Sequence, residues 1–122
     1  MSDFRRLRVW KSARLVALAS YRLTGAFPRS EMFGLAAQIR RASISIAANI
    51  AEGSDRRSDA EFARFVSMAG GSAAELTSHL ILAHDLGLLS PDDLTATLSA
   101  VEDLRRQLNA LHARLKPDRA AS

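Results

Sequence analysis

Residues 31–53 read EMFGLAAQIRRASISIAANIAEG, a segment with few charges and a helical repeat. One row of side chains recurs every three or four positions and consists of Leu35, Ile39, Ala42, Ile46 and Asn49. A neighbouring row consists of Phe33, Ala37, Ile44, Ala47 and Ala51. A helix that is apolar over more than half of its circumference is typical of one buried against several neighbours. We therefore expect an inner helix here, which ends at Gly53 because glycine adopts the left-handed conformation of helix ends.

The segment before it, from Phe4 to Ala26, predicts a first helix. Leu15 and Leu18 are expected to widen its apolar stripe, which consists of Trp10, Ala13, Ala17, Tyr21 and Thr24. The helix should end before Pro28, because the residue that precedes a proline is disfavoured in the helical conformation.

Two long helices are predicted downstream. Ser58 and Glu61 have the spacing of a capping box and open an apolar stripe that continues to about Leu86. Ser90 precedes a first-turn proline and two acidic residues, and leucines then repeat at helical spacing to Leu115. The chain therefore has four helical segments and no segment with strand-like alternation.

The predicted fold is all-α, an antiparallel up-down-up-down four-helix bundle. We expect one domain over residues 1–117 and a frayed tail over residues 118–122. Gly70 and Gly71 lie inside the third helix, where each costs on the order of 1 kcal/mol relative to alanine. We expect another backbone to pass close to them.

The composition agrees with a globular domain. The chain has 122 residues, of which 48% are hydrophobic and 25% charged, and this excludes wholesale disorder. No apolar run approaches the roughly 18 residues of a membrane span, and no signal-peptide pattern follows the basic N-terminus. The absence of cysteine excludes disulfides and thiolate metal sites, and fits a cytoplasmic location.

The charge is unevenly distributed. Residues 1–29 contain seven Arg or Lys and one Asp, whereas residues 58–89 contain one Arg and four acidic residues. Fifteen of the 17 cations are arginine, which binds phosphate or carboxylate in planar, bidentate geometry. An acidic partner is one interpretation, and the codon usage of a GC-rich genome is the other. The residues predicted to contact phosphate are Arg5, Arg6, Arg8, Lys11 and Arg14, with Arg56 and Arg57 as a second patch.

A row of polar residues interrupts the apolar inner helix. Arg41, Ser45, Asn49 and Glu52 share one helix face, and a buried charge among them would need a partner, for which Glu75 is a candidate. A satisfied polar seam that fixes helix register or a subunit contact is the favoured interpretation. A ligand-binding cluster and simple exposure to solvent are the alternatives.

Evidence for catalysis is weak. His79 and His84 are five residues apart and do not share a helix face as a metal-binding pair would. Arg105 and Arg106 precede His112 at the loose spacing of HEPN-type RNases, in which an Arg holds phosphate and a His moves a proton. This spacing also fits an ordinary solvated face, so we expect a non-enzymatic protein without metal or cofactor.

Four sequence segments resemble the bacterial four-helix-bundle family of 23S ribosomal RNA intervening-sequence proteins. They are FRRLRVWKSA (4–13), FPRSEMFGL (27–35), QIRRASISIAANIAEGSDRR (38–57) and FARFVSMAGGSAAEL (62–76). Ala47 stands where family members often have proline, and Thr77 and His79 stand where Glu and Gln are usual. The recurring polar positions of the family correspond to Arg40, Arg41, Ser45, Asn49, Glu52, Gly53, Ser72 and Glu75.

The resemblance implies a bundle that assembles into a ring-like homopentamer. A related branch comprises accessory proteins of diversity-generating retroelements, in which a basic pentamer binds nucleic acid and partners a reverse transcriptase. We therefore expect a bacterial, oligomeric protein that binds structured RNA or an RNA–DNA hybrid through backbone phosphates. The alternative is an oligomeric scaffold or accessory subunit, for example of a reverse transcriptase, with no direct nucleic-acid role and no membrane association.

Overall fold

The structure, a computed structural model, describes residues 3–115. In this part of the chain four helices and two short 3-10 turns form, and no strand is present. In chain order the elements are η1 (Phe4–Arg6), α1 (Arg8–Gly25), η2 (Arg29–Glu31), α2 (Leu35–Ser54), α3 (Asp59–Asp85) and α4 (Pro91–Leu115). The all-α prediction is confirmed for these residues, and the predicted tail over 118–122 lies outside them.

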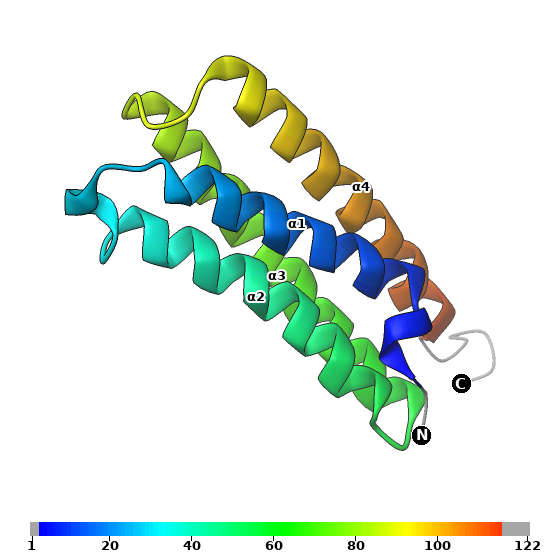
Figure 1. Ribbon diagram of the computed structural model, residues 1–122. Helices are drawn as coiled ribbons and strands as arrows, with labels where there is room; N and C mark the ends of the chain where they lie inside the picture. Colours follow the sequence, from blue (N-terminus) through cyan, green and yellow to red (C-terminus); the bar gives the residue numbers. More distant parts are fainter. Residues whose placement is uncertain (1–2, 116–122) are drawn as a thin grey trace.

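The four helices lie alongside one another, as Figure 1 shows. α1 packs against α2 and α4, and α3 also packs against α2 and α4. The α1–α2 and α3–α4 connections are at one end of the molecule, whereas the α2–α3 connection, η1 and the end of α4 are at the other (Figure 1). The N-terminal arginines and the α2–α3 loop therefore share one end.

The core runs along the centre of the four helices. Its largest fully buried side chains include Ile39 and Ile46 from α2, Leu76 and Leu80 from α3, and Leu104 from α4. Removing each such side chain from water contributes roughly 1.5–3 kcal/mol relative to leaving it exposed. These residues are among those that the periodicity assigned to the interior.

Two helix starts follow the predicted capping chemistry. The Oγ of Ser58 accepts a hydrogen bond from the backbone N of Glu61 at 3.1 Å, and the Oγ of Ser90 accepts one from the backbone N of Asp93 at 3.1 Å. Each hydroxyl satisfies an amide that the first turn leaves without a helical partner. α3 and α4 consequently begin within a residue of their predicted positions.

The buried stripe of α1 differs from the predicted one. It consists of Val9, Ala13, Val16, Ser20 and Thr24. Trp10 and Ala17 are half-buried, while Leu15, Leu18 and Tyr21 are exposed. The prediction that Leu15 and Leu18 widen the core is wrong, because α1 packs against α2 and α4 on one side only and these residues lie on its outer side.

α2 begins later than predicted. Gly34, at φ −105° and ψ −114°, is not helical, so the helix starts at Leu35 and not at Glu31. Phe33 precedes this break and is 97% exposed, which contradicts its assignment to an apolar helical row. A helical repeat cannot continue through a residue with this conformation.

Three glycines play different roles from those expected. Gly53 is helical and does not terminate α2, which continues to Ser54; among the described residues only Gly87 has a positive φ, at 77°. A Cβ on Gly53 would lie 2.8 Å from Cδ1 of Phe62, so glycine permits close packing of α2 on α3. A Cβ on Gly70 or Gly71 would meet nothing within 4 Å, so the expected close backbone does not come from this chain.

Candidate nucleic-acid interface

Three of the predicted phosphate-binding residues border one depression on the outer side of η1 and α1. Arg5, Lys11 and Arg14 line it together with Trp10 and Leu15, and its volume is about 410 Å³. Arg5 comes from η1, and Lys11 and Arg14 are three residues apart on α1, so one helical turn places them on the same side. All three are exposed to solvent.

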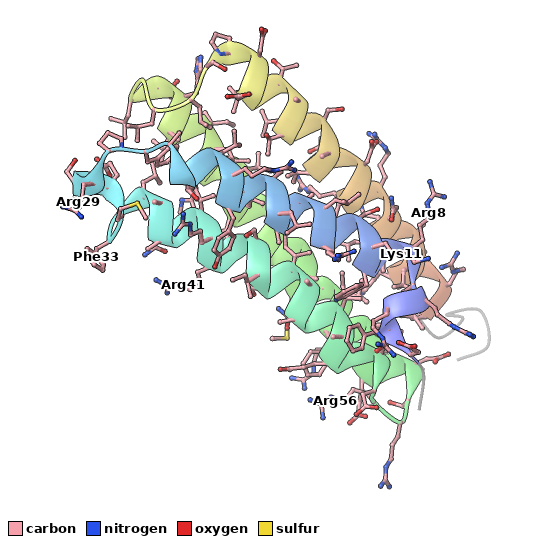
Figure 2. The ribbon with its side chains drawn as sticks, viewed as in Figure 1. Arg8, Lys11, Arg29, Phe33, Arg41 and Arg56 are labelled. Carbon is pink, nitrogen blue, oxygen red and sulfur yellow. The ribbon has the colours of Figure 1, made fainter. Side chains whose placement is uncertain are left out.

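A larger hollow of about 770 Å³ lies between η1 and the end of α2. Arg5 and Arg56 line it together with the acidic residues Asp3, Glu52 and Asp55. The guanidinium of Arg56 lies 4.6 Å from the ring centroid of Phe65, a cation–π contact that orients it. Figure 2 shows Arg56 at the end of the molecule that also holds the start of α1. This hollow brings the two predicted basic patches together, although its charge is mixed.

Arg5 is ion-paired within its own turn. Its Nε lies 2.9 Å from Oδ1 of Asp3, and its Nη2 donates to Oδ2 at 3.1 Å. These hydrogen bonds, reinforced by that from the backbone N of Arg5, lower the pKa of the Asp3 carboxyl from its ordinary value of 3.8. The same pairing raises the pKa of Arg5. At neutral pH a phosphate must therefore compete with Asp3 for this guanidinium.

Arg8 turns away from this group and towards α4. It lines a depression of about 360 Å³ with Arg106 and Gln107, and a smaller one of about 170 Å³ with Gln107 and Arg114. Arg106 is ion-paired with Asp103 one turn earlier on α4. Sequence reasoning missed Arg106 and Arg114 as basic neighbours of Arg8, although their spacing of eight residues places both on one face of α4.

The remaining predicted cations, Arg6 and Arg57, are exposed. Arg6 ends η1, and Arg57 lies in the α2–α3 loop, so both are at the end of the molecule that holds Arg5 and Arg56. Figure 2 shows that Arg29 and Phe33 lie at the opposite end. Arg5, Arg6, Arg56 and Arg57 thus lie at one end of the molecule. Lys11 and Arg14 continue from Arg5 along α1, whereas Arg8 faces α4.

The predicted polar seam lies on the outer side of the α2–α3 contact. The hydroxyl groups of Ser45 and Ser72 are 2.9 Å apart, and Nδ2 of Asn49 donates to the carbonyl oxygen of Ser45 at 2.9 Å. Ser45, Asn49 and Ser72 are half-buried, so these bonds satisfy polar groups that solvent reaches only in part. The Ser45–Ser72 bond joins α2 to α3, whereas the bond of Asn49 lies within α2.

The charged members of the seam are not buried. Arg41, Glu52 and Glu75 are all exposed within one chain, so burial in the interior, one of the interpretations that the sequence left open, does not apply to these three charges. Oε1 of Glu75 lies 3.5 Å from Nε2 of its helical neighbour His79. Figure 2 shows Arg41 on the outer side of α2. The pairing of Arg41 and Glu52 at a contact between subunits stays a prediction.

Arg40, the neighbour of Arg41, has a different environment. Its Nε donates to Oγ1 of Thr24 at 2.8 Å, and its guanidinium lies 4.7 Å from the ring centroid of Tyr21. Thr24 is fully buried and Arg40 is half-buried. Arg40 therefore joins α2 to α1.

Arg105 and His112 of the RNase-like spacing each contact another side chain. Arg105 pairs with Glu102 at 3.2 Å, while Nε2 of His112 lies 3.2 Å from the hydroxyl oxygen of Ser67 on α3. Within residues 3–115 no three His, Asp or Glu side chains are grouped as metal ligands would be. None of the helices in this range has the length and hydropathy of a membrane span.

Comparison with known proteins identifies relatives by family and by fold. The family model described as 23S rRNA-intervening sequence protein matches residues 5–110. A crystal structure of a protein of unknown function from the S23 ribosomal protein family of Bacteroides thetaiotaomicron is similar, with a TM-score of 0.80 and 21% sequence identity. The similarity covers 85% of this chain and 97% of that one, and at this identity it shows the fold alone. A comparison with curated proteins gives no match.

Proposed function

The chain belongs to the 23S rRNA-intervening sequence protein family, and from this premise we propose that it is a non-enzymatic, oligomeric protein that binds nucleic acid. The ligand is structured RNA or an RNA–DNA hybrid, held through its backbone phosphates. The chain has few aromatic residues, and Trp10 is half-buried in an edge contact with Phe4 at a centroid distance of 5.0 Å. Base stacking therefore contributes little to the proposed binding.

The observation that supports this proposal most is the grouping of Arg5, Lys11 and Arg14 around one depression. Phosphate contacts of this kind release counterions, so affinity falls steeply with salt. Assembly would repeat the group in every subunit and convert weak contacts into avid binding. Arg6, Arg56 and Arg57 at the same end extend the basic surface.

The proposal also includes the order of the helices and the way in which the subunits assemble. The helices follow in up-down-up-down order within one domain over residues 1–117, and the bundles assemble into a ring-like homopentamer in the bacterial cytoplasm. A formal net charge of +4 for each chain, multiplied by the number of subunits, favours association with a polyanion.

Fluorescence anisotropy tests the binding. Nuclease-treated protein is titrated with a labelled structured RNA, an RNA–DNA hybrid and a duplex DNA over a series of salt concentrations. Wild-type protein should bind with a steep salt dependence, and the triple variant Arg5→Ser, Lys11→Ser, Arg14→Ser should lower the magnitude of the log–log slope by up to about 3 per chain. No binding at low salt would overturn the proposal.

Single substitutions provide a matched control. Arg14→Ser and Arg29→Ser remove one exposed arginine each, from α1 and from η2 respectively. Arg14→Ser should weaken binding and Arg29→Ser should not, because only Arg14 borders the basic depression. Equal effects would mean that net charge alone determines the affinity.

The second function is an oligomeric scaffold or accessory subunit, for example of a reverse transcriptase. It is favoured by large apolar side chains in solvent, such as Leu15, Leu18 and Phe33. Absence of nucleic-acid binding together with stable assembly would favour this function. RNA cleavage by the wild type that is lost in His112→Ala would instead show an enzyme.

A further inference from the structure

The outer side of α1 carries apolar side chains that a single chain leaves in solvent. Leu15, Leu18 and Tyr21 are 63%, 48% and 42% exposed, and Ile44 of α2 is 47% exposed. An apolar depression of about 370 Å³, lined by Leu18, Tyr21 and Ile44 among others, connects the two helices. We call these four residues the α1 face. Its charged neighbours on α1 are Lys11, Arg14 and Arg22, and α1 contains no acidic residue.

A second apolar surface lies on the outer side of α3. Met68, Leu82 and Leu86 are 47%, 49% and 65% exposed. Gly71 and Glu75 lie on the same side of the helix, since the spacings from residue 68 to 71 and 75 are three and seven. We call these five residues the α3 face. Glu75 is exposed, and the α3 segment carries the acidic excess of the chain.

The two faces cannot cover each other within one chain. α1 and α3 both pack against α2 and α4 and make no contact with each other, so they are diagonal in the bundle. In Figure 1, α1 lies towards the viewer and α3 lies behind it. Each outer face therefore needs a partner from outside the chain.

Charge indicates which partner fits. Two α1 faces in contact would bring six cations together without an acidic residue from either helix, which is unfavourable. An α3 face instead offers Glu75 beside its apolar residues. Gly71 also favours a helix as occupant. Apart from the adjacent backbone of α3 itself, nothing lies within 4 Å of the position of an added Cβ, so a partner helix could approach closely.

We propose that the α1 face of one copy of this chain packs on the α3 face of a second copy. This inference rests on the oligomeric part of the proposed function and specifies its contact. The contact is heterologous, so in a pair one copy keeps an unused α3 face and the other an unused α1 face, and repetition of the contact closes into a ring. Leu18 and Tyr21 fill the centre of the interface, and Arg22 approaches Glu75 at its edge. Leu15 lies at the side of the α1 face that borders the basic depression.

Complementation between two variants tests this arrangement. One variant carries Leu15→Asp and Leu18→Asp, and the other carries Met68→Asp and Leu82→Asp; all four positions are exposed, so folding should be retained. Light scattering after size exclusion should give the mass of a single chain for each variant alone. An equimolar mixture should give a dimer, because one intact α1 face and one intact α3 face remain. Ala96→Asp with Ala100→Asp, exposed on α4, is the matched control and should keep the wild-type mass.

Other outcomes overturn the inference. Wild-type mass in both variants would place the contact elsewhere and leave the oligomeric proposal intact, whereas a single-chain wild type would contradict both. Disassembly of the α1 variant alone would show that the α1 face pairs with itself. RNA binding by the wild-type protein, measured by anisotropy, tests the nucleic-acid part of the proposed function, whereas these masses test its oligomeric part.

An exchange of charges provides a second test if an aspartate variant does not fold, as loss of its circular dichroism signal would show. Arg22→Glu and Glu75→Arg should each weaken assembly by about tenfold or more, and the two substitutions combined in one chain should restore it. Both residues are exposed, so neither change disturbs the core. Failure of the combined variant to recover assembly would overturn the proposed contact.

Discussion

A Cβ atom placed on Gly53 would lie 2.6 Å from the Cβ of Phe65. Real Cβ contacts are essentially never this short, so the backbones of α2 and α3 are closer here than any other residue at position 53 would allow. Gly53 is buried and helical, and Phe65 is only 6% exposed. The approach also places Phe65 beneath Arg56, which belongs to the candidate interface.

Gly53→Ala should therefore destabilise the protein despite the higher helix propensity of alanine. Overpacking of a core contact costs about 1–3 kcal/mol, which exceeds the gain of about 1 kcal/mol expected from propensity. The melting temperature at a fixed chain concentration should fall by roughly 4 °C for each kcal/mol lost. Gly70→Ala is the control, and it should raise the melting temperature because its Cβ meets nothing within 4 Å. An unchanged melting temperature for Gly53→Ala would contradict the close contact.

Arg40→Ala and Arg41→Ala should differ sharply, although the two arginines are adjacent. Arg40 loses a hydrogen bond to buried Thr24 and a contact with the ring of Tyr21, together worth about 1–2 kcal/mol for a half-buried group. Arg41 is exposed, so its removal should change the free energy of unfolding by less than about 0.5 kcal/mol. Denaturant titration of both variants measures the difference. Equal losses would mean that Arg41 has a structural partner.

The hydrogen bond between Ser45 and Ser72 should appear as coupling in a double-mutant cycle. Ser45→Ala or Ser72→Ala alone removes one side of this bond, whereas the double variant removes both hydroxyl groups. Oγ of Ser45 also accepts a hydrogen bond from Nδ2 of Asn49 at 3.2 Å, which Ser72→Ala leaves in place. The combined loss should be smaller than the sum of the single losses by about 0.5–1 kcal/mol. Ser12, which bonds to Gln107 between α1 and α4, shares no bond with Ser45, so the cycle of Ser45→Ala with Ser12→Ala should be additive.

The sequence predicted the helix starts correctly where a single turn of the chain determines them. The serine caps at Ser58 and Ser90 located the starts of α3 and α4, because a cap needs only its own first turn. The predicted buried stripe of α1 was wrong because it depends on contacts between helices and not on a single turn. An apolar outer row such as Leu15 and Leu18 has the same periodicity as a core row, and only the positions of α2 and α4 distinguish the two.

In the candidate site, too, some features follow from the local sequence and others from tertiary contacts. The sequence located the basic end of the chain, yet the partition of its arginines depends on tertiary contacts. Arg8 lies near α4, which is about one hundred residues away in sequence, whereas Arg5 approaches the end of α2. The exposure of Arg41 is likewise a property of packing, since the sequence could equally have placed that helix face inside.

Asp3 should restrain the binding of anions by Arg5. The hydrogen bonds from Arg5 lower the pKa of Asp3 below 3.8, so its contribution to the η1 turn is present above that value and is lost as pH falls through the lower folded-state pKa. An NMR titration should show this depressed pKa in the wild type and a value closer to 3.8 in Arg5→Ser. An unshifted titration in the wild type would contradict the ion pair.

The same pairing has a consequence for affinity at neutral pH, where Asp3 stays ionised. Asp3→Asn frees the Arg5 guanidinium and should strengthen RNA binding in the anisotropy experiment, with a steeper salt dependence and no pH dependence between pH 6 and 8. Asp55→Asn removes an equal charge from the same hollow, but Asp55 is not the partner of Arg5. A larger gain for Asp3→Asn than for Asp55→Asn would identify Arg5 as a phosphate contact. Equal gains would show that only the net charge of the hollow matters and would remove Arg5 from the interface.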